Sequence, residues 1–231
     1  MSHDALVGDI ADLLEVWVAG WSGSRSYETR KEGRFPAALR ADITGDWEYF
    51  AHDPSEAEFS DLAARTREAD TRILTILTND VARYTQLAQE HGLNVTSDSQ
   101  TMMIVDMGTQ DAEDPWLSDD DLELATSESN GVHFAVVHAD DKVAASGQVF
   151  VVRQVAVFDK IVTEPDFQRR GLGSFIMKAL AAQAFEHDVE RGLLLASLDG
   201  QHLYSHLGWK NVSQVLMLST KRVDEVDLSV A

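Results

Sequence analysis

The chain has 231 residues, of which 39 are acidic and 19 are basic, so its formal net charge is -20 at pH 7. A surface of this sign repels phosphates, which argues against nucleic-acid binding and could steer a cationic amine toward a site. The absence of cysteine excludes disulfides, thiolate nucleophiles and thiolate metal sites. No apolar run is long enough to cross a bilayer, and the first residues lack the order of a signal peptide, so we expect a cytoplasmic protein with no membrane contact.

Helix and strand patterns alternate through the first 107 residues. Apolar residues recur at helical spacing over 9–21, and Gly23 is expected to end that helix, with a polar irregular connection after it. Strands are expected at 37–43 and 47–51, followed by a helix from the candidate N-cap Ser55 to about 69. A strand at 72–78, a helix at 80–91 and a strand at 101–107 complete this part.

Residues 108–130 form the clearest boundary in the sequence. Acidic residues recur there without one basic residue. A charge run of this kind is usually a solvated linker, and its spacing does not follow an EF-hand calcium loop.

The remainder predicts three strands in succession and then alternating helices and strands. The strands are expected at 132–138, 143–152 and 155–163, followed by a helix at 175–187. A buried type of strand at 193–197, a short helix ending at Gly208 and a strand at 214–218 close the pattern. The charged tail after Ser219 is expected to be loose.

The connection between strand 155–163 and the next helix carries the motif Q-x-x-G-x-G at Gln168, Gly171 and Gly173. Such glycines let the backbone approach a ligand closely, and the first amides of the helix favour an anion such as a pyrophosphate. A P-loop is excluded because Ser174 and a phenylalanine follow the last glycine, and a dinucleotide fingerprint is excluded because Ile176 holds the third glycine position. A glycine-rich turn with nothing bound remains the alternative.

A second motif, L-Y-x-x-L-G-W, lies at 203–209. Together the two motifs resemble the acyl-CoA loop and the L-Y-x-x-x-G-F segment of the GNAT family of N-acetyltransferases, over residues 131–218. The resemblance implies an α/β (α+β) fold with a mixed, mostly antiparallel central sheet flanked by helices. It also implies an acetyl-CoA-dependent N-acetyltransferase that acts on the amine of a small molecule.

The order strand, helix, glycine, strand occurs at 73–106 and again at 193–218, which we interpret as an internal repeat. The prediction is two GNAT-like halves in tandem: a degenerate domain at 1–107, the acidic linker at 108–130 and an acetyl-CoA-binding catalytic domain at 131–231. The first half lacks the Q-x-x-G-x-G loop, so it is not expected to bind CoA in the same way. The alternative is that this order is simply common in α/β proteins. The oligomeric state, a homodimer included, is left open.

The resemblance assigns the coenzyme to two neighbouring segments. The loop amides would hold the diphosphate, and the pantetheine arm would pair with the end of the preceding strand. The assigned residues are Ile161, Val162, Thr163, Gln168, Arg169, Arg170, Gly171, Leu172, Gly173 and Ser174. For either arginine the alternative is a solvated charge.

Tyr204 is the predicted general acid, because in the family the tyrosine at this place in the motif lies near the coenzyme sulfur, where a phenol can protonate a thiolate. Its alternative role is to fill the gap between helix and sheet. Asp159, the acidic side chain within strand 155–163, is the candidate for binding the substrate ammonium or relaying its proton. A solvent-facing role for Asp159 is equally open.

Two departures from the family pattern motivate a second hypothesis, a non-catalytic acyl-CoA sensor or interaction module. Residues 197–200 replace an asparagine that many members carry, and no glutamate stands where some members keep a general base.

His202 and His206 are four apart, a spacing that can place two imidazoles on one metal ion. No third ligand is evident nearby, so no metal is expected.

Overall fold

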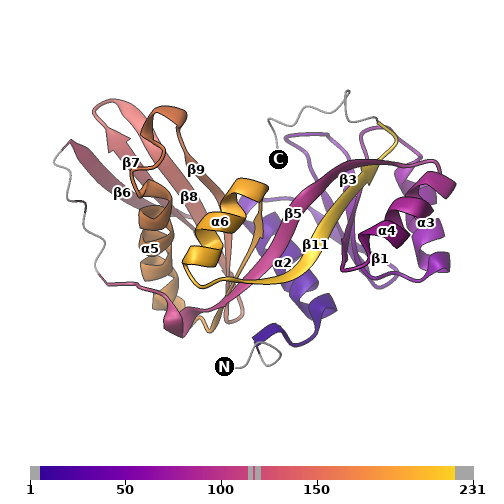
Figure 1. Cartoon of the computed structure of the whole chain (residues 1–231), viewed down its shortest axis with the longest axis horizontal. Coiled ribbons are helices and arrows are strands. Elements are labelled where there is room, and N and C mark those ends of the chain that lie inside the picture. Colours follow the sequence, from indigo (N-terminus) through magenta and orange to yellow (C-terminus); the bar gives the residue numbers. More distant parts are fainter. Residues whose placement is uncertain (1–5, 114–116, 118–120, 222–231) are drawn as a thin grey trace.

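A computed structural model of the chain describes residues 6–113, 117 and 121–221. Within these residues, strands from both ends of the chain form one 11-stranded sheet with helices on its two faces (Figure 1). The α-helices and strands in chain order are α2 (Ile10–Arg25), β1 (Thr29–Glu32), β2 (Phe35–Leu39), β3 (Trp47–His52), α3 (Glu56–Thr66), β4 (Ile73–Thr78), α4 (Val81–Glu90), β5 (Asn94–Asp106), β6 (Leu122–Ser129), β7 (Val132–Ala139), β8 (Lys142–Val152), β9 (Val155–Thr163), α5 (Leu172–Ala184), β10 (Arg191–Ala196), α6 (Leu198–His206) and β11 (Lys210–Ser219). Short 3-10 helices are η1 (Met107–Thr109), η2 (Pro165–Phe167) and η3 (Phe185–His187).

The strand order across the sheet is β1-β2-β3-β4-β11-β5-β10-β9-β8-β7-β6. Two of the neighbouring pairs, β3 with β4 and β9 with β10, are parallel, and the others are antiparallel. The predicted fold class, a mixed and mostly antiparallel sheet flanked by helices, is therefore confirmed.

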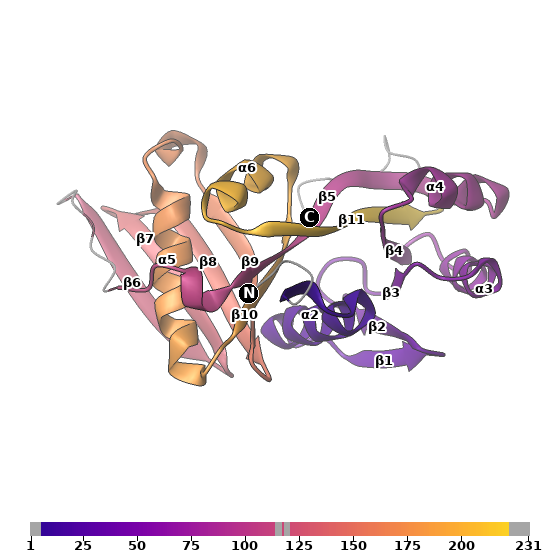
Figure 2. The same cartoon turned by 60° about the horizontal axis from the view of Figure 1, so that its bottom comes forward.

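The two halves of the chain exchange their last strands. Strand β5 of the first half lies between β10 and β11, and β11 of the second half lies between β4 and β5. Figures 1 and 2 show these two long strands side by side, crossing from one lobe of the molecule to the other. Gly92 precedes β5 and Gly208 precedes β11, and both have positive φ (71° and 88°). The two glycines occupy equivalent positions in the predicted repeat, so their shared conformation agrees with it. The division into domains 1–107 and 131–231 stays a prediction.

The interior strands carry near-continuous apolar runs because both faces of the sheet are covered. In β9, Val155 and Val157 belong to the hydrophobic cluster that includes the buried apolar side chains of α2. Ala156 and Phe158 belong to a second cluster, which includes the buried residues of α5. A third cluster fills the space between the other lobe of the sheet and helices α3 and α4. Helix α3 begins as expected, since Ser55 and Glu58 form a reciprocal capping box.

Helix α2 does not end at Gly23, so that expectation was wrong. The helix continues to Arg25 and closes on Ser26 in the left-handed conformation. A Cβ atom on Gly23 would lie 2.8 Å from Phe150 Cε1, and one on Gly20 would lie 2.4 Å from Val157 Cγ2. These glycines therefore serve close packing of α2 on β8 and β9, which outweighs their low helix propensity.

Two other expectations need correction. Residues 122–129, within the expected linker, form strand β6, which pairs with β7 over its whole length. Residues 29–32, in the expected irregular connection, form strand β1. Both are exposed edge strands whose backbone pairing needs no apolar pattern, so periodicity does not reveal them. Residues 114–116 and 118–120 of the linker, and 222–231 of the tail, lie outside the described residues. Among the described helices, none has the length and apolar character that crossing a membrane requires.

Candidate active site

Strands β9 and β10 separate partway along their length. Their parallel pairing covers only 155–157 and 191–193. Beyond it, β10 pairs with β5, and β9 pairs with β8 as far as Thr163. The described ladder therefore leaves Ile161, Val162 and Thr163 with an edge open toward β10, where an extended ligand could hydrogen-bond.

A β-bulge lies in β9 at the start of this open edge. Ser146 of β8 faces Val162 and Gln148 faces Asp159, so two steps along β8 match three along β9. Lys160 within the bulge has φ 53°, a left-handed conformation that is uncommon for a side-chain-bearing residue. A bulge of this type re-aims the backbone and leaves one residue out of the ladder.

The glycine loop lies at the far end of β9. Gly171 is the N-cap of α5 with φ 81°, and it carries no side chain to accept from the first amides of the helix. The first intrahelical bond runs from Phe175 N to Gly171 O (3.1 Å), so the amides of residues 172–174 precede it. A Cβ on Gly171 would meet nothing within 4 Å, and the first turn has no acidic residue. These features suit an anion at the helix N-terminus.

The remaining loop residues hold the loop against its neighbours. Gln168 Nε2 donates to the carbonyl oxygen of Thr163 at 3.4 Å, which connects the loop to the end of β9. A Cβ on Gly173 would lie 3.0 Å from Leu203 Cδ2, so the glycine leaves room for the Leu203 side chain of α6. Arg169 and Arg170 are exposed, and the guanidinium of Arg170 lies 5.6 Å from the ring centre of Phe167.

The equivalent corner of the first half is built differently. There β3 and β4 pair over five consecutive residues, 48–52 with 73–77, so no comparable opening forms. The N-terminus of α3 is occupied by its own capping box, and its first turn carries Glu56 and Glu58. The hydrogen bond from Arg34 holds the pKa of Glu58 at about 2, so this carboxylate stays charged where an incoming anion would sit.

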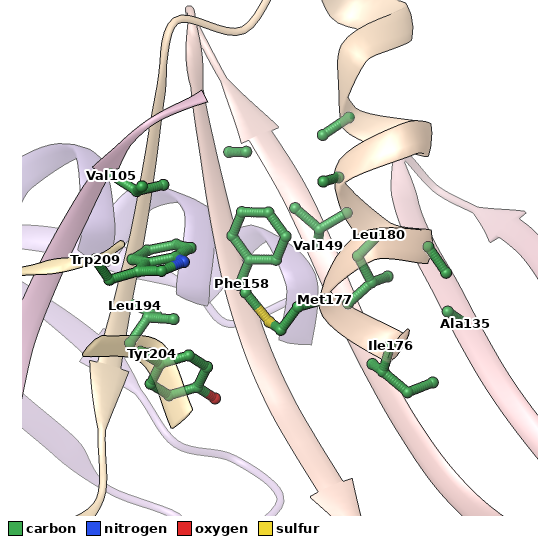
Figure 3. Packing of buried hydrophobic residues seen from close by; sticks show 14 of the residues in the cluster. Val105, Ala135, Val149, Phe158, Ile176, Met177, Leu180, Leu194, Tyr204 and Trp209 are labelled. Carbon is green, nitrogen blue, oxygen red and sulfur yellow. The ribbon is translucent and has the colours of Figure 1, made fainter. Parts of the chain in front are cut away.

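Tyr204 lies in α6 beside the splayed strands. Its side chain is 6% exposed and packs against the indole of Trp209, with ring centres 5.9 Å apart. In Figure 3 its hydroxyl points away from Trp209. Burial, together with the charge of Asp159, raises the pKa of Tyr204 to about 12. A Cβ on Gly200 would lie 3.0 Å from Tyr204 Cε2, so the glycine in segment 197–200 makes room for the ring.

Asp159 is held by an ion pair that the sequence did not predict. Arg25 donates from Nε to Asp159 Oδ2 (2.9 Å) and from Nη2 to Oδ1 (3.1 Å). Gln148 Nε2 donates to the same Oδ2 at 3.2 Å and to Ser24 Oγ at 3.1 Å. Both carboxylate oxygens of Asp159 thus accept hydrogen bonds from the protein itself, which holds the carboxylate in one position.

A cleft of about 560 Å³ is lined by part of β9 and by Tyr204 of α6. Of the predicted site residues, Asp159, Ile161, Val162 and Tyr204 line it, whereas Thr163 and the loop 168–174 do not. The first half of the chain supplies much of the opposite wall, including Trp21, Arg25, Arg40, Glu48 and Thr75.

Sequence reasoning missed the contribution of the first half. The positions Trp17, Trp21 and Arg25 are successive members of an i, i+4 row on α2, and all three line the cleft. That spacing was the available signal, but it could not identify which strand the row would face. Arg40 and Glu48 carry no motif at all.

Among the described residues, no group of three or more His, Cys, Asp or Glu side chains that could hold a metal ion is found, at His202 and His206 or elsewhere. In segment 197–200, which replaces the asparagine of other family members, Ser197 caps α6 by accepting from the amide of Gly200 at 3.2 Å. Ser197 also lines the cleft.

Comparison with known proteins agrees with this architecture. The chain is similar in structure to a GCN5-related N-acetyltransferase from Kribbella flavida (TM-score 0.66, 14% identity, 90% of this chain and 94% of the other). It is also similar to a tandem GNAT protein from the clavulanic acid biosynthesis pathway (TM-score 0.57, 13% identity, 94% and 95%). A third similar structure is a GCN5-related N-acetyltransferase from Sphaerobacter thermophilus (TM-score 0.56, 9% identity, 85% and 79%).

At these identities the structural likeness establishes the fold alone. No curated protein matches the sequence. The family evidence comes from the sequence profile of the acetyltransferase (GNAT) family, which matches residues 94–209, just over half of the chain. That span contains the splayed strands, the glycine loop and Tyr204. The chain therefore belongs to the acetyltransferase (GNAT) family.

Proposed function

We propose that this protein transfers an acetyl group from acetyl-CoA to the amine of a small molecule. The observation that carries the proposal is the asymmetry between the two halves. In the second half, the parallel strands β9 and β10 separate, and helix α5 begins at a glycine N-cap with no acidic residue in its first turn. Within the described residues, the first half has neither feature. In the first half, the corresponding strands are fully paired over 48–52 and the helix N-terminus is capped by Ser55.

The residues present suit the coenzyme in two places. The amides at 172–174, aided by the helix dipole, would bind the diphosphate, with Arg169 and Arg170 on the exposed side of the loop. The open edge of β9 at 161–163 would pair with the amide-bearing pantetheine arm as a short added strand. When bound, acetyl-CoA would supply the thioester whose carbonyl carbon accepts the amine and whose sulfur leaves.

Tyr204 is the proposed proton donor to that sulfur. With a pKa of about 12 the phenol is fully protonated at neutral pH, which is the state that donation requires. The backbone amide within the β9 bulge is a candidate donor to the oxyanion of the tetrahedral intermediate. The amine must lose one proton to become a nucleophile and a second as the amide forms. Asp159 is held by Arg25, so we propose that it fixes the local charge, and proton relay through it stays a prediction.

Ligand-induced stabilisation tests the proposal directly. Acetyl-CoA at about 100 times its Kd should stabilise the fold by about 2.7 kcal/mol, which raises the Tm of a chain of this size by about 5 to 11 °C. Release of free CoA thiol on addition of amines would then report turnover. An unchanged Tm at millimolar acetyl-CoA would refute the proposal. Binding without turnover across a broad amine panel would instead favour the non-catalytic sensor.

A further inference from the structure

The charge of the cleft differs from that of the chain. Four basic side chains and three acidic ones line the cleft, although the whole chain has about twice as many acidic as basic residues. The basic residues are Arg25, Arg40, Lys160 and Lys221, and the acidic residues are Glu48, Asp70 and Asp159. The general surface could attract a cation, whereas the cleft itself is suited to a ligand that also carries a negative group.

Arg40 is the most unusual of these cations. Its side chain is 8% exposed, and Nη1 donates to Glu48 Oε2 at 3.1 Å. Glu48 is itself buried and also accepts from Thr75 Oγ1 at 2.6 Å. Arg40 Nε is buried and has no hydrogen-bond partner among the described residues. A buried guanidinium donor without a partner is costly. Because Arg40 also lines the cleft, its guanidinium is the candidate contact for a ligand there.

The surroundings of Arg40 extend the same site toward the proposed reaction centre. The guanidinium groups of Arg40 and Arg25 lie 5.9 Å and 5.3 Å from the ring of Trp21. Arg25 in turn binds Asp159, whose charge acts on Tyr204. One indole thus lies beside both Arg40 and the Arg25–Asp159 pair, and it forms part of the cleft lining.

We propose that the acceptor is a small zwitterion, an amino acid or a similar amine that also carries a carboxylate. The carboxylate would bind the guanidinium of Arg40, whose planar fork matches carboxylate geometry. The carbon skeleton would lie on Trp21, and the amine would face the end of the cleft at Tyr204 and Asp159. A polyamine fits less well, because it would bring its cations against the two arginines of the cleft, Arg25 and Arg40. This inference rests on the acetyl transfer proposed above.

Matched acceptors test the proposal without altering the protein. Each L-amino acid of a panel would be assayed for acetylation beside its carboxamide and its decarboxylated amine, with spermidine included as a polycation. For the amino acids that are acetylated, kcat/KM should fall about 10- to 100-fold when the carboxylate is removed, as expected for a lost charge-assisted hydrogen bond. The proposal is overturned if no amino acid is acetylated faster than its carboxylate-free partners, or if spermidine is the best acceptor.

Variants of the buried Arg40–Glu48 pair test whether Arg40 binds the carboxylate of the acceptor. Arg40→Gln alone would leave Glu48 buried and unpaired, so the double variant Arg40→Gln/Glu48→Gln is the main test and Arg40→Lys a second one. The double variant should raise KM for the amino acid at least about tenfold and leave the carboxamide almost unchanged. Arg34→Gln, which breaks the exposed Arg34–Glu58 pair, is the matched control and should change neither substrate. Equal losses for both substrates in the double variant would show a structural role only.

Calorimetry with acetyl-CoA alone separates the two proposals. If acetyl-CoA binds but removal of the acceptor's carboxylate does not change kcat/KM, the zwitterion inference fails and the proposal of acetyl transfer stands. If acetyl-CoA does not bind, the proposed function fails and this inference fails with it.

Discussion

Arg25 and Asp159, 134 positions apart in the chain, form a two-point ion pair in which each carboxylate oxygen accepts from one guanidinium nitrogen. The pair joins the last turn of α2 to β9 at the residue before the bulge. Their side chains are 11% and 17% exposed, so the pair is largely shielded from solvent. It therefore ties the first half of the chain to the strand that would carry the coenzyme.

Breaking this pair should destabilise the protein. Arg25→Met leaves a shielded carboxylate without its partner, and we expect a loss of about 1 to 3 kcal/mol in the free energy of unfolding, measured by urea denaturation. The control is Lys31→Met, which breaks the exposed Lys31–Glu15 pair and should cost no more than about 0.5 kcal/mol. Equal costs for the two variants would show that the Arg25 pair adds no more than a surface contact.

Substitution of the first loop glycine should separate coenzyme binding from stability. Gly171→Ala forces a side chain into a left-handed position at the N-cap of α5, where the added methyl group has no neighbour within 4 Å. Gly33, with φ 61° and open space around it, provides the same backbone strain far from the loop. Both alanine variants should lose about 1 kcal/mol of stability. Calorimetry with CoA should show at least about a tenfold weaker Kd for Gly171→Ala only, and a matched weakening in Gly33→Ala would count against the loop as the binding site.

Removal of one hydroxyl should separate coenzyme binding from turnover. Tyr204→Phe keeps the ring that packs against Trp209 and removes the proposed proton donor. The Kd for CoA should stay within about twofold, while kcat falls about 10²- to 10⁴-fold. Tyr84→Phe is the control, because the Tyr84 hydroxyl donates to the carbonyl oxygen of Pro54 (2.8 Å), which lies in the first half of the chain. An unchanged kcat in Tyr204→Phe would remove Tyr204 from the mechanism.

The ionisation of Tyr204 should be visible in the alkaline range. Because folding raises this pKa from 10.0 to about 12, the neutral phenol stabilises the fold below pH 10, and that contribution is lost between pH 10 and 12. The measurement is the tyrosinate absorbance of the native protein minus that of Tyr204→Phe, which isolates one of the four tyrosines. The difference should appear near pH 12 or with unfolding. A difference titrating near pH 10 would show that the phenol is not buried as described.

The elements that recur in the family were predictable from the sequence, because their signals are local. Strand β9 has the predicted bounds 155–163, and Ser55 was identified by its capping position alone. Gly92 and Gly208 marked the ends of their helices because a left-handed residue is needed there. The loop at Gly171 was identified as a helix N-terminus from its two glycines between a strand pattern and a helix pattern, although α5 begins at Leu172 and not at 175 as expected.

The parts that depend on distant packing were not predictable. Gly23 has the same local properties as a helix-ending glycine, and only the ring of Phe150 packed against it shows that the glycine is there to allow close packing. The exchange of β5 and β11 leaves no trace in the periodicity of either strand. Arg25 and Arg40 become cleft residues only because the two halves of the chain meet.

The exchange of β5 and β11 also sets the order in which the protein can be completed during synthesis. The first half needs β11 between β4 and β5, yet β11 begins at Lys210, near the end of the chain. Until that strand leaves the ribosome, the nascent chain has apolar strands with unpaired backbone edges, which are prone to associate with other chains. A premature stop shortly before Lys210 would therefore damage the half of the protein that is made first, although the missing residues lie far from that half in the sequence.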